Sequence, residues 1–446
     1  MNGTSSGRIV QAVQIVRASL RLGGVCVWVV LPAAIVDKVR TPPYRHTVVF
    51  DSLFKRSEQL ARIQANRLAL RFVNGVEWAI RDARAVVGRT PYDVILRRDK
   101  LEVRHYHAGT TKPTHALPVL LVPPLMVKPF IFDLYPGRSL VAALVQRGFD
   151  VYLVDFGEPD AADAYVTLED YILDWLPSAA AAVKHDAPCE ELSMLGYCMG
   201  GLFALSHVAA NHDDSVRNIV AIGAPIDFEK MGLLAWVAKH GGDQIEGIAK
   251  RIGNIPGGLS SIGFRLMSPM KNVTRYGDLF MNLWSDEYVN GFDAMNQWVG
   301  QFIDYPQGAF MQFYQDFVRQ NKLVKGELRL GDRAANLRDV HASILAFAGD
   351  SDQVATVAAS RAIIKAVGTK DSRFVVVPGG HMGIFAGSRA PDLVWAVTAD
   401  WLAQRSQVRA APKRKRAAKA EPRLMARTPT RAAKRSKKAA SAQSRA

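Results

Sequence analysis

The chain has 446 residues, of which 49% are hydrophobic and 22% are charged. This composition excludes a wholly disordered chain and supplies enough apolar side chains for one large domain or two smaller ones. The net charge of +16 is unevenly distributed, because residues 407–446 carry 14 lysines and arginines and a single acidic residue. The rest of the chain is nearly neutral, which argues against a nucleic-acid-binding fold. Residues 407–446 are predicted to form a disordered basic tail.

The cysteines and histidines point to a reducing compartment and no metal. Three cysteines, Cys26, Cys189 and Cys198, are too few for a disulfide framework in a chain of this length. No group of histidines and cysteines has the spacing of a zinc site. We therefore predict a cytoplasmic protein without a metal cofactor.

Residues 1–89 are predicted to form a helical N-terminal region. Apolar residues recur at close to helical spacing from Leu60 to Ile80, and Gly88 with Pro91 provides a stop signal. Residues 22–36 form an uncharged apolar segment that is short for a membrane-spanning helix and contains Pro32. We interpret this segment as a helix that docks on a partner or on a membrane surface, with insertion into a membrane as the alternative.

Residues 90–406 are predicted to form an α/β domain. The sequence after residue 90 is typical of a hairpin up to about residue 103. Short apolar runs typical of buried strands then alternate with helical stretches such as 138–147 and 202–210. This alternation predicts a mostly parallel sheet with helices on both faces. The strands are expected at residues 118–122, 150–154, 192–195, 218–222, 343–347 and 374–377.

The stretch from about 225 to 340 interrupts this alternation. It contains 15 of the 39 aromatic residues of the chain and no clear strand. An aromatic-rich helical insertion in an α/β domain predicts a cap over the ends of the strands. A second small core is the alternative, and it is compatible with a cap.

The motif G-Y-C-M-G-G at residues 196–201 follows an apolar strand and precedes a helix. It has the pattern of the nucleophile elbow of the α/β-hydrolase fold, with Cys198 in the position of the usual serine. The glycines permit a tight turn, and the N-terminus of the next helix favours a thiolate. The alternative is a buried structural cysteine among glycines needed for packing.

In this fold an acid and then a histidine follow the nucleophile along the chain. Asp352 and His381 each come just after a predicted strand, at the sheet edge where such sites assemble. We therefore predict a triad in which Cys198 is the nucleophile, His381 the general base and Asp352 the group that orients it. The backbone N–H groups of Met199 and Met126 are the candidate oxyanion donors.

A cysteine nucleophile favours acyl transfer from a coenzyme A thioester. Thiolate attack exchanges one C–S bond for another, so the acyl-enzyme stays activated and attack by a hydroxyl is downhill. Simple ester hydrolysis more often uses serine. We expect no permanently bound cofactor, with the coenzyme A thioester as substrate.

Residues 90–402 resemble the polyhydroxyalkanoate synthases, most closely the catalytic subunit of the two-component class III type. The similar segments, in chain order, are VPP at 122–124, FDL at 132–134, DVYLVD at 150–155, TLEDY at 167–171, NIPG at 254–257 and GHMG at 380–383. The catalytic residues of the family match Cys198, Asp352 and His381. Two positions depart from the family, which usually has histidine where this chain has Gln353 and often threonine where it has Leu202.

The resemblance implies an enzyme that polymerises (R)-3-hydroxyacyl-CoA into a polyester and releases coenzyme A at the surface of cytoplasmic granules. Its expected partners are the growing polyester and either a second copy of the chain or a partner synthase subunit. The same triad also suits a cysteine esterase, thioesterase or polyester depolymerase, which differs in excluding water less well. An inactive scaffold that binds granules or membranes is a third alternative.

The basic residues of the tail at 407–446 suggest a separate binding function. Lysine and arginine interleaved with alanine, without aromatic residues, suit non-specific contact with phosphates. DNA, polyphosphate and an anionic granule surface are the candidate partners. The alternative is a solvated tail that keeps the protein soluble.

Overall fold

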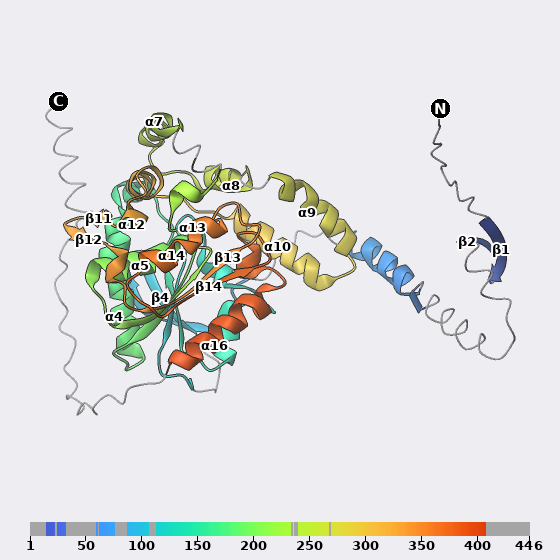
Figure 1. The fold of residues 1–446 in the computed structure, drawn as a ribbon, viewed down its shortest axis with the longest axis horizontal. Helices are drawn as coiled ribbons and strands as arrows, with labels where there is room; N and C mark the ends of the chain where they lie inside the picture. Colours follow the sequence, from blue (N-terminus) through green and yellow to red (C-terminus); the bar gives the residue numbers. More distant parts are fainter. Residues whose placement is uncertain are drawn as a thin grey trace, which may run out of the picture. The chain divides into compact units, whose positions relative to one another are not determined.

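The structure is a computed structural model that describes residues 15–22, 25–32, 59–60, 62–75, 87–106, 113–232, 235, 240–266 and 269–406. The chain divides into two compact units, Met1–Ala79 and Ile80–Ala446 (Figure 1). The predicted basic tail lies outside the described residues, as do residues 33–36.

The first unit contains a hairpin where a helix was expected. Strands β1 (Ile15–Leu22) and β2 (Val25–Pro32) pair antiparallel, from Ile15 opposite Pro32 to Leu22 opposite Val25. The prediction of a helix over residues 22–36 is therefore wrong for the described part of that segment. The apolar run is rich in β-branched valine, which favours strands, and a glycine pair separates the two strands in the sequence.

The helical prediction is confirmed for residues 62–75, which are α-helical. Several of its apolar side chains are exposed, with Phe72 at 75% and Leu68 at 66%. Among the helices that the structure describes, none combines the length and the apolar character needed to cross a bilayer.

The second unit is built on an eight-stranded sheet with the strand order β14-β13-β10-β9-β5-β8-β4-β3 (Figure 1). All the predicted strands are present, and the pairings among β5, β8, β9, β10, β13 and β14 are parallel. The expected hairpin forms the antiparallel edge. The strands are β3 (Tyr92–Arg98), β4 (Leu101–Tyr106), β5 (Val119–Val122), β8 (Val151–Asp155), β9 (Leu192–Tyr197), β10 (Val216–Ile222), β13 (Ser343–Gly349) and β14 (Ser372–Val377).

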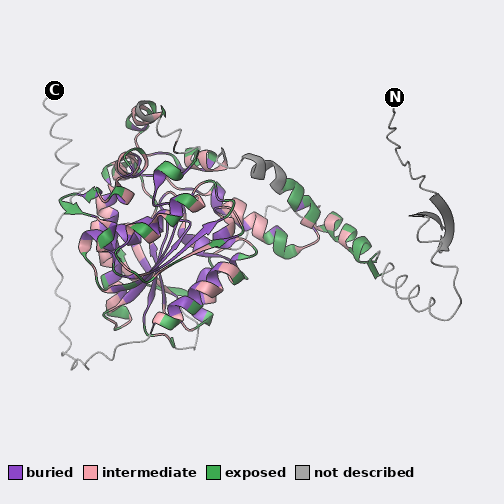
Figure 2. Cartoon of the chain, in the orientation of Figure 1, coloured by how far each residue is buried: buried purple, intermediate pink, exposed green. Residues whose placement is uncertain are grey.

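Alternating side chains of each strand bury on opposite faces of the sheet. Leu120 and Val122 of β5 belong to one hydrophobic core, whereas Val119 and Leu121 belong to the other. Figure 2 shows the strands as the most buried part of this unit. The first core is covered by α4 (Leu176–Asp186), α5 (Met199–Asn211), α13 (Val357–Arg361) and α14 (Ile363–Ala366), and the second by α3 (Leu140–Gln146), α15 (Gly383–Ala386) and α16 (Ala396–Arg405).

The predicted helical insertion lies between β10 and β13. Its helices are α7 (Gly242–Ile252), α8 (Gly257–Leu266), α9 (Pro269–Asn282), α10 (Asp286–Gly300), α11 (Gln307–Gln312) and α12 (Lys322–Lys325). A hairpin of two-residue strands, β11 (Arg329–Leu330) and β12 (Arg333–Ala334), follows them. The insertion contacts the loop after β5, where the Ile303 N–H donates to the Met126 carbonyl at 3.0 Å and the Trp298 indole donates to the Lys128 carbonyl at 2.9 Å. It therefore covers the end of β5, as a cap should.

Candidate active site

The nucleophile elbow joins β9 to α5. Cys198 is half-buried and adopts φ 53° and ψ −121°, a backbone conformation that is uncommon for any residue except glycine. The turn leaves no room for side chains on either side of it. A Cβ added to Gly196 would lie 2.3 Å from the Gly200 carbonyl carbon, and one added to Gly200 would lie 1.9 Å from the Val122 carbonyl oxygen. The two glycines thus allow α5 to begin directly against β9 and β5.

Asp352 and His381 come together from the loops after β13 and β14. His381 Nδ1 and Asp352 Oδ2 are hydrogen-bonded at 2.8 Å. The other carboxylate oxygen, Oδ1, accepts the backbone N–H groups of Val354 and Ala355, each at 2.8 Å. Asp352 is 5% exposed and His381 is 8% exposed. Backbone donors therefore fix the carboxylate, which in turn fixes the imidazole ring.

The third predicted residue, Cys198, lies close enough to His381 for its charge to act on the imidazole ring. Burial of the His381 ring lowers its pKa, but the negative charges of Asp352 and Cys198 outweigh burial and raise the pKa to about 10. The imidazolium form is therefore stabilised between two acidic groups. This arrangement is the one that a cysteine–histidine nucleophile requires.

Tyr197 is a site residue that the sequence interpretation did not single out. Its ring stacks on that of His381, with centroids 5.2 Å apart, and its hydroxyl donates to the His381 backbone carbonyl at 3.2 Å. The Tyr197 ring also stacks on that of Phe385, with centroids 4.2 Å apart. The signal in the sequence that could have indicated this role is the position of Tyr197 in the elbow motif, directly before Cys198.

The two candidate oxyanion donors lie on the segments expected of them. Met199 is the first residue of α5, where N–H groups lack partners within the helix. Met126 lies in the loop after β5 with a positive φ of 60°. The close approach of Gly200 to Val122 brings the start of α5 against the end of β5, from which the Met126 loop continues.

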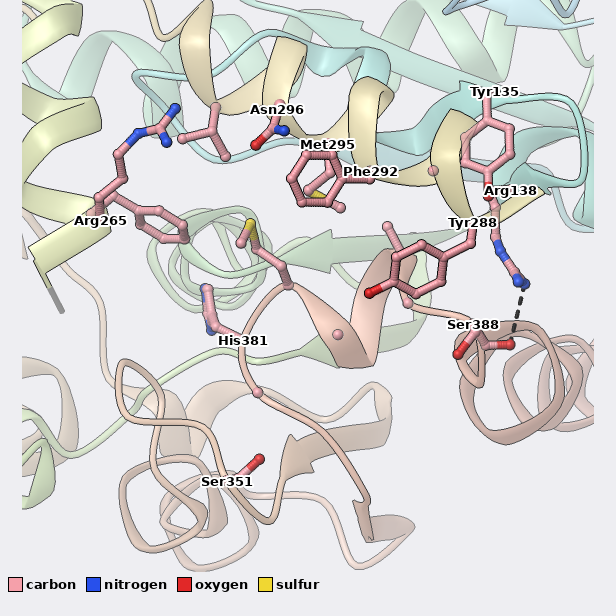
Figure 3. Close-up of a pocket in the computed structure, with 18 of the residues that line it drawn as sticks. Tyr135, Arg138, Arg265, Tyr288, Phe292, Met295, Asn296, Ser351, His381 and Ser388 are labelled. Atoms are coloured by element: carbon pink, nitrogen blue, oxygen red, sulfur yellow. Dashed lines mark hydrogen bonds between the residues drawn. The ribbon is translucent and has the colours of Figure 1, made fainter. Parts of the chain in front are cut away.

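A cavity of about 550 Å³ opens beside His381 (Figure 3). Its walls come from α8, α10, the loop at 351–354 and the segment 380–388. His381 is part of the lining, whereas Cys198 is not. Within the described parts of the chain, no three histidine, cysteine or acidic side chains are grouped so that they could hold a metal ion.

The fold and the elbow define the class of protein. Residues 119–388 match the family model of the alpha/beta hydrolase fold, and residues 56–144 match that of the poly-beta-hydroxybutyrate polymerase (PhaC) N-terminus. The chain is an α/β-hydrolase-fold protein.

Curated relatives narrow this class to one family. Over 346 residues the chain is 31% identical to the poly(3-hydroxyalkanoate) polymerase subunit PhaC of Synechocystis, covering 75% of this chain and 90% of the relative. It is 30% identical to the protein of that name from Thiocystis violacea, covering 72% and 90%. The relative from Haloferax mediterranei is 33% identical, but the match covers 72% of this chain and 65% of that longer protein. The chain belongs to the poly(3-hydroxyalkanoate) polymerase subunit family.

Proposed function

We propose that this chain is a polyhydroxyalkanoate synthase, an acyltransferase that polymerises (R)-3-hydroxyacyl-CoA into a polyester. The observation that carries the proposal is the hydrogen bond between His381 and Asp352 beside Cys198, which lies at a nucleophile elbow. The family to which the chain belongs supports the same activity, because its curated members carry the name of poly(3-hydroxyalkanoate) polymerase subunits.

In the first half-reaction the Cys198 thiol gives its proton to His381 Nε2, and the thiolate attacks the thioester carbonyl. The backbone N–H groups of Met199 and Met126 stabilise the oxyanion that forms. The new C–S bond to Cys198 replaces the C–S bond to coenzyme A. The leaving coenzyme A thiolate takes from His381 the proton that Cys198 gave up. The step therefore needs no other reactant.

In the second half-reaction a 3-hydroxyl group gives its proton to His381 and attacks the acyl group on Cys198. A C–O ester bond forms while the C–S bond to Cys198 breaks, and the sulfur regains the proton. Asp352 holds the ring in the correct tautomer and stabilises the imidazolium in both steps. Water in place of the hydroxyl would give hydrolysis, so the acceptor that reaches the thioester decides between synthase and thioesterase.

Trapping the acyl-enzyme tests the assignment of the nucleophile. After brief incubation with 3-hydroxybutyryl-CoA, mass spectrometry of peptides should find the hydroxyacyl group on Cys198. The Cys198→Ala variant should form no adduct and release no coenzyme A. Cys189→Ala is the matched control, because Cys189 is also a free, half-buried cysteine but lies outside the site. An adduct on Cys189, or full activity of Cys198→Ala, would overturn the triad.

The proposal extends to what the basic tail binds and to the subunits with which the chain assembles. The 14 lysines and arginines of residues 407–446 supply a contact for polyphosphate, DNA or an anionic granule surface. The word "subunit" in the names of the relatives supports a partner subunit or a second copy of the chain, working at the surface of a cytoplasmic granule. Polyphosphate binding should weaken as salt rises and vanish when residues 407–446 are deleted; binding that survives the deletion would eliminate the tail as the contact.

A further inference from the structure

The cavity beside His381 has an apolar wall that has no role in the two half-reactions described above. We name it the α10 pocket and define it by Phe264, Phe292, Met295, Val299, Met382 and Ala386. Phe264, Met295 and Met382 are partly buried against the second hydrophobic core, which leaves part of each side chain for a ligand. The cavity volume of about 550 Å³ lies within the range typical of small-molecule sites.

The charged groups of the pocket already have partners. Arg138, whose side chain is 13% exposed, pairs with Glu287 at 2.8 Å and donates to the Ser388 carbonyl at 3.2 Å. Arg265 also takes part in an interaction within the protein. A ligand phosphate would have to displace these partners, so the pocket suits a neutral molecule better than the phosphates of coenzyme A. The polar side chains on its walls, such as Asn296 and Tyr288, suit ester carbonyls (Figure 3).

The position of His381 indicates which reactant the pocket serves. His381 lines the pocket and Phe264 lies beside it, with ring centroids 6.4 Å apart, but Cys198 is not in the lining. The acyl donor becomes bonded to the sulfur, whereas the acceptor must bring its hydroxyl to the imidazole. A molecule bound in the pocket can therefore contact the imidazole of His381 without being bonded to the sulfur of Cys198.

We propose that the α10 pocket binds the acceptor, with its 3-hydroxyl group at His381 and its side chain against Met295 and Phe292, and so sets the acceptor side-chain length. This inference rests on the proposed synthase function. The ligand chemistry is a neutral 3-hydroxyacyl group, which comes either from the end of a polyester chain or from a second 3-hydroxyacyl thioester whose coenzyme A stays outside. When the hydroxyl attacks, its proton passes to His381 and the Cys198 thioester becomes an ester.

The two half-reactions can be measured separately with an acyl donor that has no hydroxyl group. Butyryl-CoA can acylate Cys198 but cannot act as an acceptor, so it should release one burst of coenzyme A. Adding the methyl ester of a 3-hydroxybutyrate trimer, or in a second arm 3-hydroxybutyryl-CoA, then measures acceptor-dependent transfer and distinguishes the two sources. No burst from the unmodified chain would mean that the proposed function itself has failed.

The variant Met295→Trp fills the pocket, and Asn290→Trp places the same ring on an exposed position of α10 outside the lining. Both variants should keep the burst amplitude, while transfer to at least one acceptor falls about tenfold in Met295→Trp alone. An equal loss of burst and transfer in Met295→Trp would assign the pocket to the donor. Unchanged transfer to both acceptors would remove the pocket from the reaction.

A second variant keeps the inference falsifiable if Met295→Trp does not fold. Phe292→Ala enlarges the pocket, and we expect it to raise the ratio of transfer to 3-hydroxyoctanoyl over 3-hydroxybutyryl acceptors by about tenfold. An unchanged ratio would show that the pocket does not contact the acceptor side chain.

Discussion

The ring of Tyr197 stacks on the ring of His381, and its hydroxyl donates to the His381 backbone carbonyl at 3.2 Å. The residue directly before Cys198 thus contacts both the ring and the backbone of His381. One short elbow therefore positions both the sulfur and the imidazole. The proposed catalytic residues are thus held in place by a residue outside the triad.

Tyr197→Phe removes the hydroxyl and keeps the stacked ring. The loss of one hydrogen bond should lower the free energy of unfolding by about 1 kcal/mol. If Tyr197 positions His381, the variant should also shift the pH profile of coenzyme A release. A stability change with an unaltered pH profile would limit Tyr197 to a structural role.

Asp352→Asn should lower the rate of coenzyme A release by about 10⁴-fold, because an amide favours the wrong tautomer of His381. Asp350→Asn is the control. Asp350 lies in the same loop, and its carboxylate accepts the Gly379 N–H at 3.0 Å without contacting the imidazole. Steady-state kinetics should show a much smaller effect in the control, and equal losses in both variants would contradict a specific role for Asp352.

The raised pKa of His381 predicts a pH-dependent stability. Burial lowers this pKa and the Asp352 and Cys198 charges raise it, from 6.5 to about 10 in the folded protein. The imidazolium therefore contributes stability that is fully present below pH 6.5 and is lost as the pH rises towards 10. Denaturant unfolding of the parent and of His381→Gln should show a difference that shrinks across this range. A difference that grows with pH would contradict the assignment.

Gly200→Ala should destabilise the protein by about 1–3 kcal/mol or more, because the added methyl group meets the Val122 carbonyl oxygen at 1.9 Å. The atoms that the methyl group would meet belong to the backbone of Val122 and Pro123, so they cannot move aside easily. Gly263→Ala is the matched control on α8, where nothing lies within 4 Å of the new methyl group. Thermal unfolding should show a lower Tm for Gly200→Ala and an equal or higher Tm for Gly263→Ala.

Much of the fold was predictable because its signals are local. Buried parallel strands need continuous apolar runs, and the runs at 118–122 and 343–347 become β5 and β13. In the α/β-hydrolase fold the nucleophile, the acid and the histidine follow one another along the chain, each just after a strand. Cys198, Asp352 and His381 have this order, so the triad could be predicted from the sequence. The same reasoning failed at β2, because an apolar run alone does not distinguish a helix from a strand.

The α10 pocket and the role of Tyr197 depend on contacts between segments far apart in the sequence. Phe264 reaches His381 only because the insertion folds back over the sheet, and no local pattern specifies that contact. Met295 has the spacing of an ordinary apolar helix residue. Its place on the wall of a cavity depends on what packs opposite α10, which the sequence alone does not give.

The most direct test of the central claim is the product formed from 3-hydroxybutyryl-CoA by the purified full-length chain, analysed by size-exclusion chromatography and NMR. We predict a polyester with coenzyme A released in proportion to the ester bonds formed, and neither product from Cys198→Ala. Release of coenzyme A with free 3-hydroxybutyrate and no polymer would contradict the synthase assignment and identify a thioesterase instead.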